Sequence, residues 1–198
     1  MRVAIIDMGG ANLASLKNAL IRLGVDVFVT TSAADIQEAD RVILPGVGHA
    51  GHAMERLASL SLIDSIRSTQ KKVLGICLGM QILFDYLEEG RVMGLGILPG
   101  RVCLLEAKSN FRVPNMGWAQ LQIQEGQASY LLQGIESDAY FYFTHSYACP
   151  QVAQVRALTR DKYPVSAILE HENFFATQFH PEKSGPAGVR LLSNFLYQ

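Results

Sequence analysis

The residue best suited to nucleophilic chemistry is Cys77, at the centre of the motif Gly75-Ile76-Cys77-Leu78-Gly79. This G-x-C-x-G pattern joins an apolar strand pattern to an apolar helix pattern, which is the thiol version of a nucleophile elbow. Such a turn needs small neighbours, and it places the sulfur at a helix N-terminus, where partial positive charge favours a thiolate. The motif therefore predicts a reactive thiol, with the amide of Leu78 facing the oxyanion. A small buried core cysteine is the alternative that the pentapeptide leaves open.

A base for this thiol is offered by the segment Phe179-His180-Pro181-Glu182. Pro181 forces His180 into an extended conformation, and residues two apart in extended chain project to the same side. The carboxylate of Glu182 can thus orient the imidazole of His180, which would activate Cys77 and later protonate the leaving amine. A lone histidine is usually a surface or core residue, but His180 has an acidic partner at a usable spacing.

The first half of the chain alternates short apolar runs with segments of helical period, which predicts right-handed crossovers and a mainly parallel sheet covered on both faces. Asp7, the Pro45–Gly48 segment and Cys77 all follow predicted strands, and ligands bind at that end of such sheets. The predicted strands are Arg2–Ile6, Val25–Val29, Arg41–Leu44 and Val73–Cys77, and the predicted helices are Leu13–Leu23, Ala50–Leu60 and Leu78–Leu87.

The second half is rich in strand patterns separated by turns, which predicts a mixed or antiparallel extension of the sheet. We therefore expect one domain, residues 1–198, with a three-layer α/β, flavodoxin-like fold and a C-terminal helix. The strands are expected at Val102–Glu106, Gln120–Gln124, Ala139–Thr144, Val152–Leu158, Val165–Leu169 and Phe174–Phe179, and the helix at Ala187–Leu196.

Composition narrows the class of protein. Hydrophobic residues make up 49% of the 198 residues and charged residues 18%, which suits one buried core. A net charge of -1 gives no reason to expect nucleic acid or a membrane surface as a partner. Three cysteines cannot all pair, and without close C-x-x-C spacing they favour a cytoplasmic protein with no metal site; Cys103 and Cys149 are expected to be structural. No cofactor is expected.

The motifs around Cys77 and His180 resemble those of class I glutamine amidotransferases. Further segments are similar to those of one subfamily, the glutaminase subunits of imidazole glycerol phosphate synthases, and the resemblance covers essentially the whole chain. The segments that carry it are Gly75–Gln81, Phe179–Glu182, Asp7–Leu13, Pro45–Gly48, Pro114–Trp118 and Tyr142–Tyr147.

The resemblance implies a class I amidotransferase fold and a role for each site residue. Cys77 would attack the side-chain amide of L-glutamine, with His180 as base and acid and Glu182 as its orienting group. Further residues would complete the site: Val47, Gly48 and Leu78 at the oxyanion, Gln81 and Glu89 on the substrate, with Glu89 facing its ammonium group, and Ser146 and Tyr147 on its carboxylate.

The resemblance also implies a heterodimer with a TIM-barrel cyclase that docks over the glutaminase site, on a face that includes Asn12, Trp118 and Lys183. Similar proteins often carry tyrosine and glycine where this chain has Met8 and Ala11, and histidine in place of Asn115.

Three other functions stay open at this level. A glutaminase of another pathway would share the thiol chemistry, and a stand-alone thiol hydrolase would act in full without a partner. A non-catalytic flavodoxin-like binding module would keep its function without the Cys77 thiol.

Overall fold

The structure, a computed structural model, describes residues 1–10, 13–109 and 111–198. Its main sheet has nine strands in the order β2-β1-β3-β4-β13-β12-β11-β8-β9. The five strands from β2 to β13 are parallel, and the strands from β13 to β9 pair antiparallel. The predicted parallel sheet with an antiparallel extension is confirmed.

The central strands of the parallel part are almost continuously apolar and buried on both faces, whereas β2, at the edge of the sheet, is partly exposed. Their bounds are Arg2–Ile6 (β1), Asp26–Thr30 (β2), Arg41–Leu44 (β3), Lys72–Ile76 (β4) and Phe174–Thr177 (β13). The antiparallel strands are Asn115–Ile123 (β8), Tyr140–His145 (β9), Val155–Thr159 (β11) and Ser166–His171 (β12).

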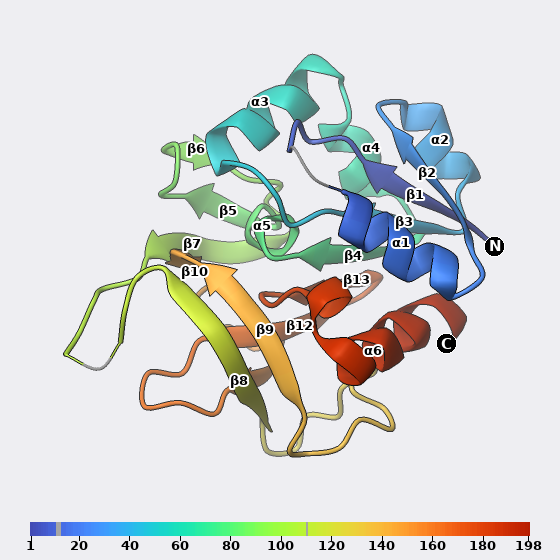
Figure 1. Ribbon diagram of the computed structural model, residues 1–198. Coiled ribbons are helices and arrows are strands. Elements are labelled where there is room, and N and C mark those ends of the chain that lie inside the picture. Colours follow the sequence, from blue (N-terminus) through green and yellow to red (C-terminus); the bar gives the residue numbers. More distant parts are fainter. Residues whose placement is uncertain (11–12, 110) are drawn as a thin grey trace.

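Helices cover the two faces of this sheet, which gives the predicted three layers (Figure 1). Leu20 of α1 (Ala14–Arg22) and Phe195 of α6 (Gly185–Tyr197) belong to the core on one face. Ile36 of α2, Leu57 of α3 and Ile66 of α4 belong to the core on the other face. The bounds of these three helices are Ala33–Glu38 (α2), Ala50–Ser59 (α3) and Ile63–Ser68 (α4). None of the helices in the described part of the chain is long and apolar enough to cross a membrane.

The predicted helix from Leu78 to Leu87 is wrong. Helix α5 spans only Leu78–Gln81, and Phe84–Leu87 forms β5 of a second, four-stranded sheet in the order β10-β7-β5-β6. The run is short and largely apolar, interrupted by Gln81 and Asp85, so its periodicity does not separate a buried helix from a buried strand. Its backbone is paired instead by the chain that follows, since the N–H of Leu95 donates to Ile82 and that of Ile97 to Leu83.

The second sheet was not predicted, although its strand Leu98–Leu104 (β7) overlaps the expected strand at Val102–Glu106. Its other strands, Val92–Met93 (β6) and Tyr147–Ala148 (β10), contain two residues each, too few to show an alternating pattern. The remaining predicted strands and helices are present, with ends displaced by a few residues.

The antiparallel extension folds back toward the carboxyl end of the parallel strands. Tyr142 of β9 accepts a hydrogen bond from the N–H of His180 at 2.9 Å, and its own N–H donates to the Ser184 hydroxyl at 3.0 Å. Phe141 and Phe179 pack with their ring centroids 4.3 Å apart. These contacts bring the end of β9 beside the turn that follows β13, close to α5 (Figure 1).

Candidate active site

Cys77 lies at a strained turn between β4 and α5. Its φ of +49° and ψ of −101° are unusual for a residue with a side chain, as in a nucleophile elbow. A Cβ on Gly75 would lie 2.5 Å from the Gly79 carbonyl oxygen, and one on Gly79 would lie 2.0 Å from the Leu44 oxygen. Both glycines are therefore required by close backbone approach, as the motif predicted.

His180 and Glu182 follow β13, the strand beside β4. The Nδ1 of His180 lies 2.8 Å from Oε1 of Glu182, and only 3% and 8% of the two side chains are exposed. A Cβ built on Gly46 would lie 2.9 Å from His180 Cε1 and 3.0 Å from Cys77 Cβ, so both side chains flank this glycine. The imidazole of His180 thus lies between the thiol of Cys77 and the carboxylate of Glu182.

The electrostatics of His180 favour its charged form. Burial alone lowers the pKa of His180, but its hydrogen bonds to Cys77 and Glu182 and their charges outweigh burial and raise it to about 9. At neutral pH the imidazole is therefore protonated, with one N–H directed to the carboxylate. An imidazolium beside a cysteine favours the thiolate and is ready to protonate a leaving group.

A cavity of about 150 Å³ opens at Cys77 and is lined by all four of the predicted substrate residues. Thr144 and His145 also line it, and neither was predicted. The residues that line it are Gly46, Gly48, Cys77, Leu78, Gln81, Glu89, Thr144, His145, Ser146 and Tyr147.

Two of the three predicted oxyanion residues, Gly48 and Leu78, line the cavity together with Cys77. Leu78 is the first residue of α5, so its N–H has no partner within the helix. Gly48, with φ +116°, lines the cavity. Val47 is not among the lining residues, and a Cβ on Gly10 would lie 2.4 Å from the Val47 carbonyl oxygen, so this carbonyl faces Gly10.

The backbone of Tyr147 is turned toward the cavity. The Leu105 N–H donates to the Ser146 carbonyl at 2.8 Å, which makes Tyr147 and Leu104 a non-hydrogen-bonded pair of the two strands. The N–H and carbonyl of Tyr147 consequently point away from β7. Its carbonyl accepts from Gln81 Nε2 at 2.9 Å, so its N–H lies on the same edge and suits an anionic ligand.

His145 supports this segment from behind. Its Nδ1 lies 2.8 Å from the Tyr147 carbonyl and must donate to it, while Nε2 lies 3.0 Å from Asn115 Nδ2 and accepts. The pKa of His145 is lowered to about 4, because burial and the charge of His180 outweigh the hydrogen bond to the Tyr147 carbonyl, which raises it. His145 is therefore neutral, as its two hydrogen bonds require.

Comparison with known proteins agrees with this geometry. The family model for glutamine amidotransferase class-I matches residues 4–198. This chain belongs to the class I glutamine amidotransferases.

Relatives of this amidotransferase are similar over nearly their whole length. The chain is 47% identical over 196 residues to imidazole glycerol phosphate synthase subunit HisH 2 of Legionella pneumophila strain Lens, covering 98% of this chain and 96% of that one. It is 46% identical over 194 residues to subunit HisH of Xanthomonas axonopodis pv. citri strain 306, with the same coverage.

Solved structures agree on the fold. A glutamine amidotransferase structure has a TM-score of 0.74 at 19% identity and covers 98% of this chain and 96% of that one. The structure of PurLQS from Thermotoga maritima has a TM-score of 0.70 at 19% identity, with coverage of 98% and 97%.

Of the predicted partner-facing residues of this amidotransferase, Trp118 and Lys183 lie together. The Trp118 side chain on β8 is 55% exposed and meets the Tyr142 ring edge-on at 5.7 Å. Lys183 Nζ lies 5.9 Å from the centroid of the same ring. Asn12 lies outside the described residues.

Gln178 is a site residue that the sequence analysis missed. Its Nε2 lies 3.6 Å from Cys77 Sγ, and its Oε1 accepts from Gln81 Nε2 at 3.2 Å. The sequence held no clear signal for it, because Gln178 lies in a bend after β13 and meets Cys77 only through the fold. The other two cysteines differ in exposure, since Cys149 is buried and Cys103 is exposed.

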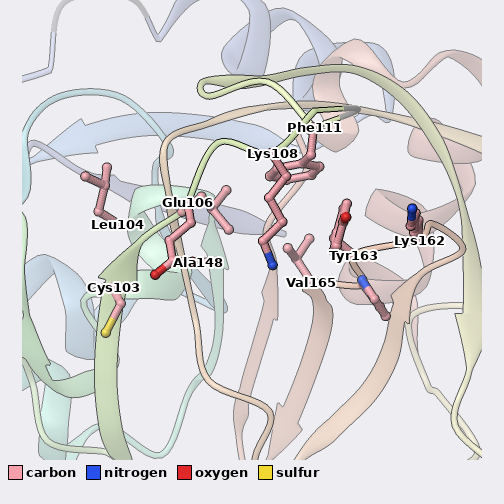
Figure 2. Close-up of a pocket in the computed structure, with 11 residues that line it drawn as sticks. Cys103, Leu104, Glu106, Lys108, Phe111, Ala148, Lys162, Tyr163 and Val165 are labelled. Atoms are coloured by element: carbon pink, nitrogen blue, oxygen red, sulfur yellow. The ribbon is translucent and has the colours of Figure 1, made fainter.

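A larger cavity of about 400 Å³ lies beside β7 and β10. Its lining includes Lys108 and Tyr163, and Lys108 Nζ stands 4.4 Å from the Tyr163 ring centroid (Figure 2). None of the triad residues lines it. The smaller cavity is lined by Cys77, the candidate nucleophile, and by Leu78 and Tyr147, so it is the candidate active site.

Proposed function

We propose that this chain is the glutaminase subunit of an imidazole glycerol phosphate synthase, one cytoplasmic domain that forms a heterodimer with a TIM-barrel cyclase. The observation that carries the proposal is the array of Cys77, His180 and Glu182 at a cavity sized for a small amino acid. Near full-length similarity to subunits with that name supports the choice of pathway.

In this mechanism Cys77 Sγ attacks the side-chain amide carbon of L-glutamine, and a C–S bond forms. The oxyanion meets the N–H of Leu78 and an amide of the loop at Val47 and Gly48. The His180 imidazolium gives its proton to the amide nitrogen, the C–N bond breaks, and ammonia leaves. Neutral His180 then takes a proton from water, whose oxygen attacks the thioester and releases glutamate and the thiol.

The substrate is held at its two charged ends. Glu89 suits the α-ammonium group, and the amides of Ser146 and Tyr147 suit the α-carboxylate. Gln81 bonds the Tyr147 carbonyl and Gln178 rather than pointing freely into the cavity. It therefore acts in this proposal by holding the carboxylate-binding segment in place.

The partner docks over the exposed face around Trp118 and Lys183. Ammonia released into neutral water is mostly protonated and no longer a nucleophile, so a closed passage to the cyclase preserves its reactivity. Tyr142 joins that face to the candidate catalytic residues, since its ring is near both Trp118 and Lys183 and its carbonyl accepts from the His180 N–H. Docking of the partner on this face therefore affects the position of His180.

Glutaminase assays on the isolated chain, on the complex with the cyclase, and on the complex holding the cyclase's nucleotide substrate test this function. We expect low turnover for the isolated chain and the highest turnover for the nucleotide-bound complex. One oxyanion donor is worth about a hundred- to a thousand-fold in rate, so an amide turned by docking gives a response of that order. Equal turnover in all three samples would favour a stand-alone hydrolase.

A further inference from the structure

Glu89 contacts both the cavity at Cys77 and the start of helix α3. It lines the cavity together with Cys77. Its Oε2 also accepts a hydrogen bond of 2.7 Å from the N–H of Ala50, the first residue of α3. Since a carboxylate has two oxygens, Oε1 is left for a ligand in the cavity.

A second contact ties the same turn to the same helix. A Cβ on Gly90 would lie 2.8 Å from both the N and the Cα of Gly51, so the backbones of residues 89–90 and 50–51 touch. The N–H of Gly51 is held by Nδ1 of His49 at 3.1 Å. The first turn of α3 is therefore fixed against the turn that carries Glu89.

Helix α3 follows the predicted oxyanion loop after a single intervening residue, His49. The other end of this loop is fixed by β3, where Leu44 pairs with Gly75 of β4. The loop of Gly46, Val47 and Gly48 is thus fixed at one end by β3 and at the other by the first turn of α3. The Glu89 carboxylate helps to hold that first turn in place.

We infer that Glu89 is a positioning residue for the oxyanion loop as well as the partner of the substrate ammonium. This inference rests on the proposed glutaminase function. An ammonium group on Oε1 restricts rotation of the carboxylate and holds Oε2 on the Ala50 N–H. Binding of a correct amino acid and the placing of the oxyanion donors are coupled through this one side chain, so recognition of the ammonium affects turnover as well as affinity.

Two variants separate the two tasks. Glu89→Gln keeps an oxygen for the Ala50 N–H but loses the charge, whereas Glu89→Ala loses both. In the complex with the cyclase, we expect both variants to raise KM for glutamine by roughly ten- to a hundredfold, the range of a charge-assisted hydrogen bond. We expect kcat of Glu89→Ala to fall roughly tenfold below that of Glu89→Gln.

The decisive substrate is the deaminated glutamine analogue, 4-carbamoylbutanoate, which has no ammonium group. With this analogue the difference in kcat between the two variants should persist, because it reports the tie to α3 alone. Hydrogen exchange of the Ala50 amide in the free protein gives a readout independent of activity, and it should be faster in Glu89→Ala than in Glu89→Gln. Glu88→Ala is the matched control, since Glu88 accepts from the Leu104 N–H instead.

Equal kcat for the two Glu89 variants on both substrates, with equal exchange at Ala50, would overturn the positioning role while wild-type turnover still supports the glutaminase. A wild-type complex without glutaminase activity would overturn the proposed function and this inference with it.

Discussion

Replacing Glu182 with glutamine tests how the imidazole of His180 is charged and held. The 2.8 Å contact joins two side chains that are only 3% and 8% exposed, so solvent screens it little. A hydrogen bond to a charged group contributes about 1.5–3 kcal/mol, which corresponds to roughly one to two pKa units. The pKa of His180, about 9 in the wild type, should therefore fall to roughly 7–8 in the variant.

The same magnitude predicts the loss of activity. We expect kcat/KM of the complex to fall about ten- to a hundredfold in Glu182→Gln. His180→Ala removes the acid and base itself, and general acid–base catalysis is worth about a hundred- to ten-thousandfold. It should therefore be the worse variant.

Stability should change as well, with a defined dependence on pH. Oε2 of Glu182 is buried without a hydrogen-bond partner among the described residues, so the new amide NH2 has no acceptor there and costs about 1–3 kcal/mol. Protonated His180 stabilises the fold fully below about pH 6.5, the pKa of a histidine in the unfolded chain, and this stabilisation is lost as pH rises through about 9. Between these two pH values the free energy of unfolding should fall less in the variant than in the wild type.

The measurement is an NMR titration of the His180 ring in the free protein, alongside kcat/KM of the complex. Glu125→Gln, on an exposed loop, is the control. An unchanged pKa of His180 in Glu182→Gln would refute the electrostatic reasoning. A Glu182→Gln variant less active than His180→Ala, with folding intact, would refute the assignment of roles.

Three further substitutions have defined outcomes. The pKa of His145 is about 4 in the folded protein and about 6.5 in the unfolded chain. The neutral ring therefore stabilises the fold above about pH 6.5, and this stabilisation is lost as pH falls toward 4. In urea unfolding, the free energy of unfolding of His145→Gln should fall less with acid than that of the wild type, by up to ~3 kcal/mol. Gly46→Ala would place a Cβ 2.9 Å from His180 Cε1, so the His180 ring must move. A misplacement of about 1 Å costs on the order of a hundredfold in rate, and kcat should fall by that factor. A melting curve checks that the variant is folded. Trp118→Ala should weaken cyclase binding by about thirtyfold in calorimetry, as for an interface anchor, whereas Ile21→Ala, also at a side chain 55% exposed, should leave it unchanged.

The parallel half of the fold and the triad could be predicted because their signals are local. Each buried strand is a continuous apolar run, and the strained turn at Cys77 requires the glycines that flank it. The predicted contact of His180 with Glu182 is present and His180 is extended, but Pro181–Lys183 form a 3-10 turn rather than the extended chain that was expected.

The rest depends on contacts between distant segments. The fold-back of β9, which brings His145 and Tyr142 to the catalytic centre, is set by pairing across the sheet and by the packing of Phe141 on Phe179. The helix expected through Leu87 failed because later backbone took up its hydrogen bonds. The role of Glu89 at α3 has no sequence signal, since Ala50 is 39 residues away.

The most direct test of the central claim compares two nitrogen sources in a complex carrying Cys77→Ala. If Cys77 is the glutaminase nucleophile and the cyclase receives its ammonia, the variant complex should make product from added ammonia at the wild-type rate and none from glutamine. Normal glutamine-dependent turnover in Cys77→Ala would contradict the account, because no thioester could then form at residue 77.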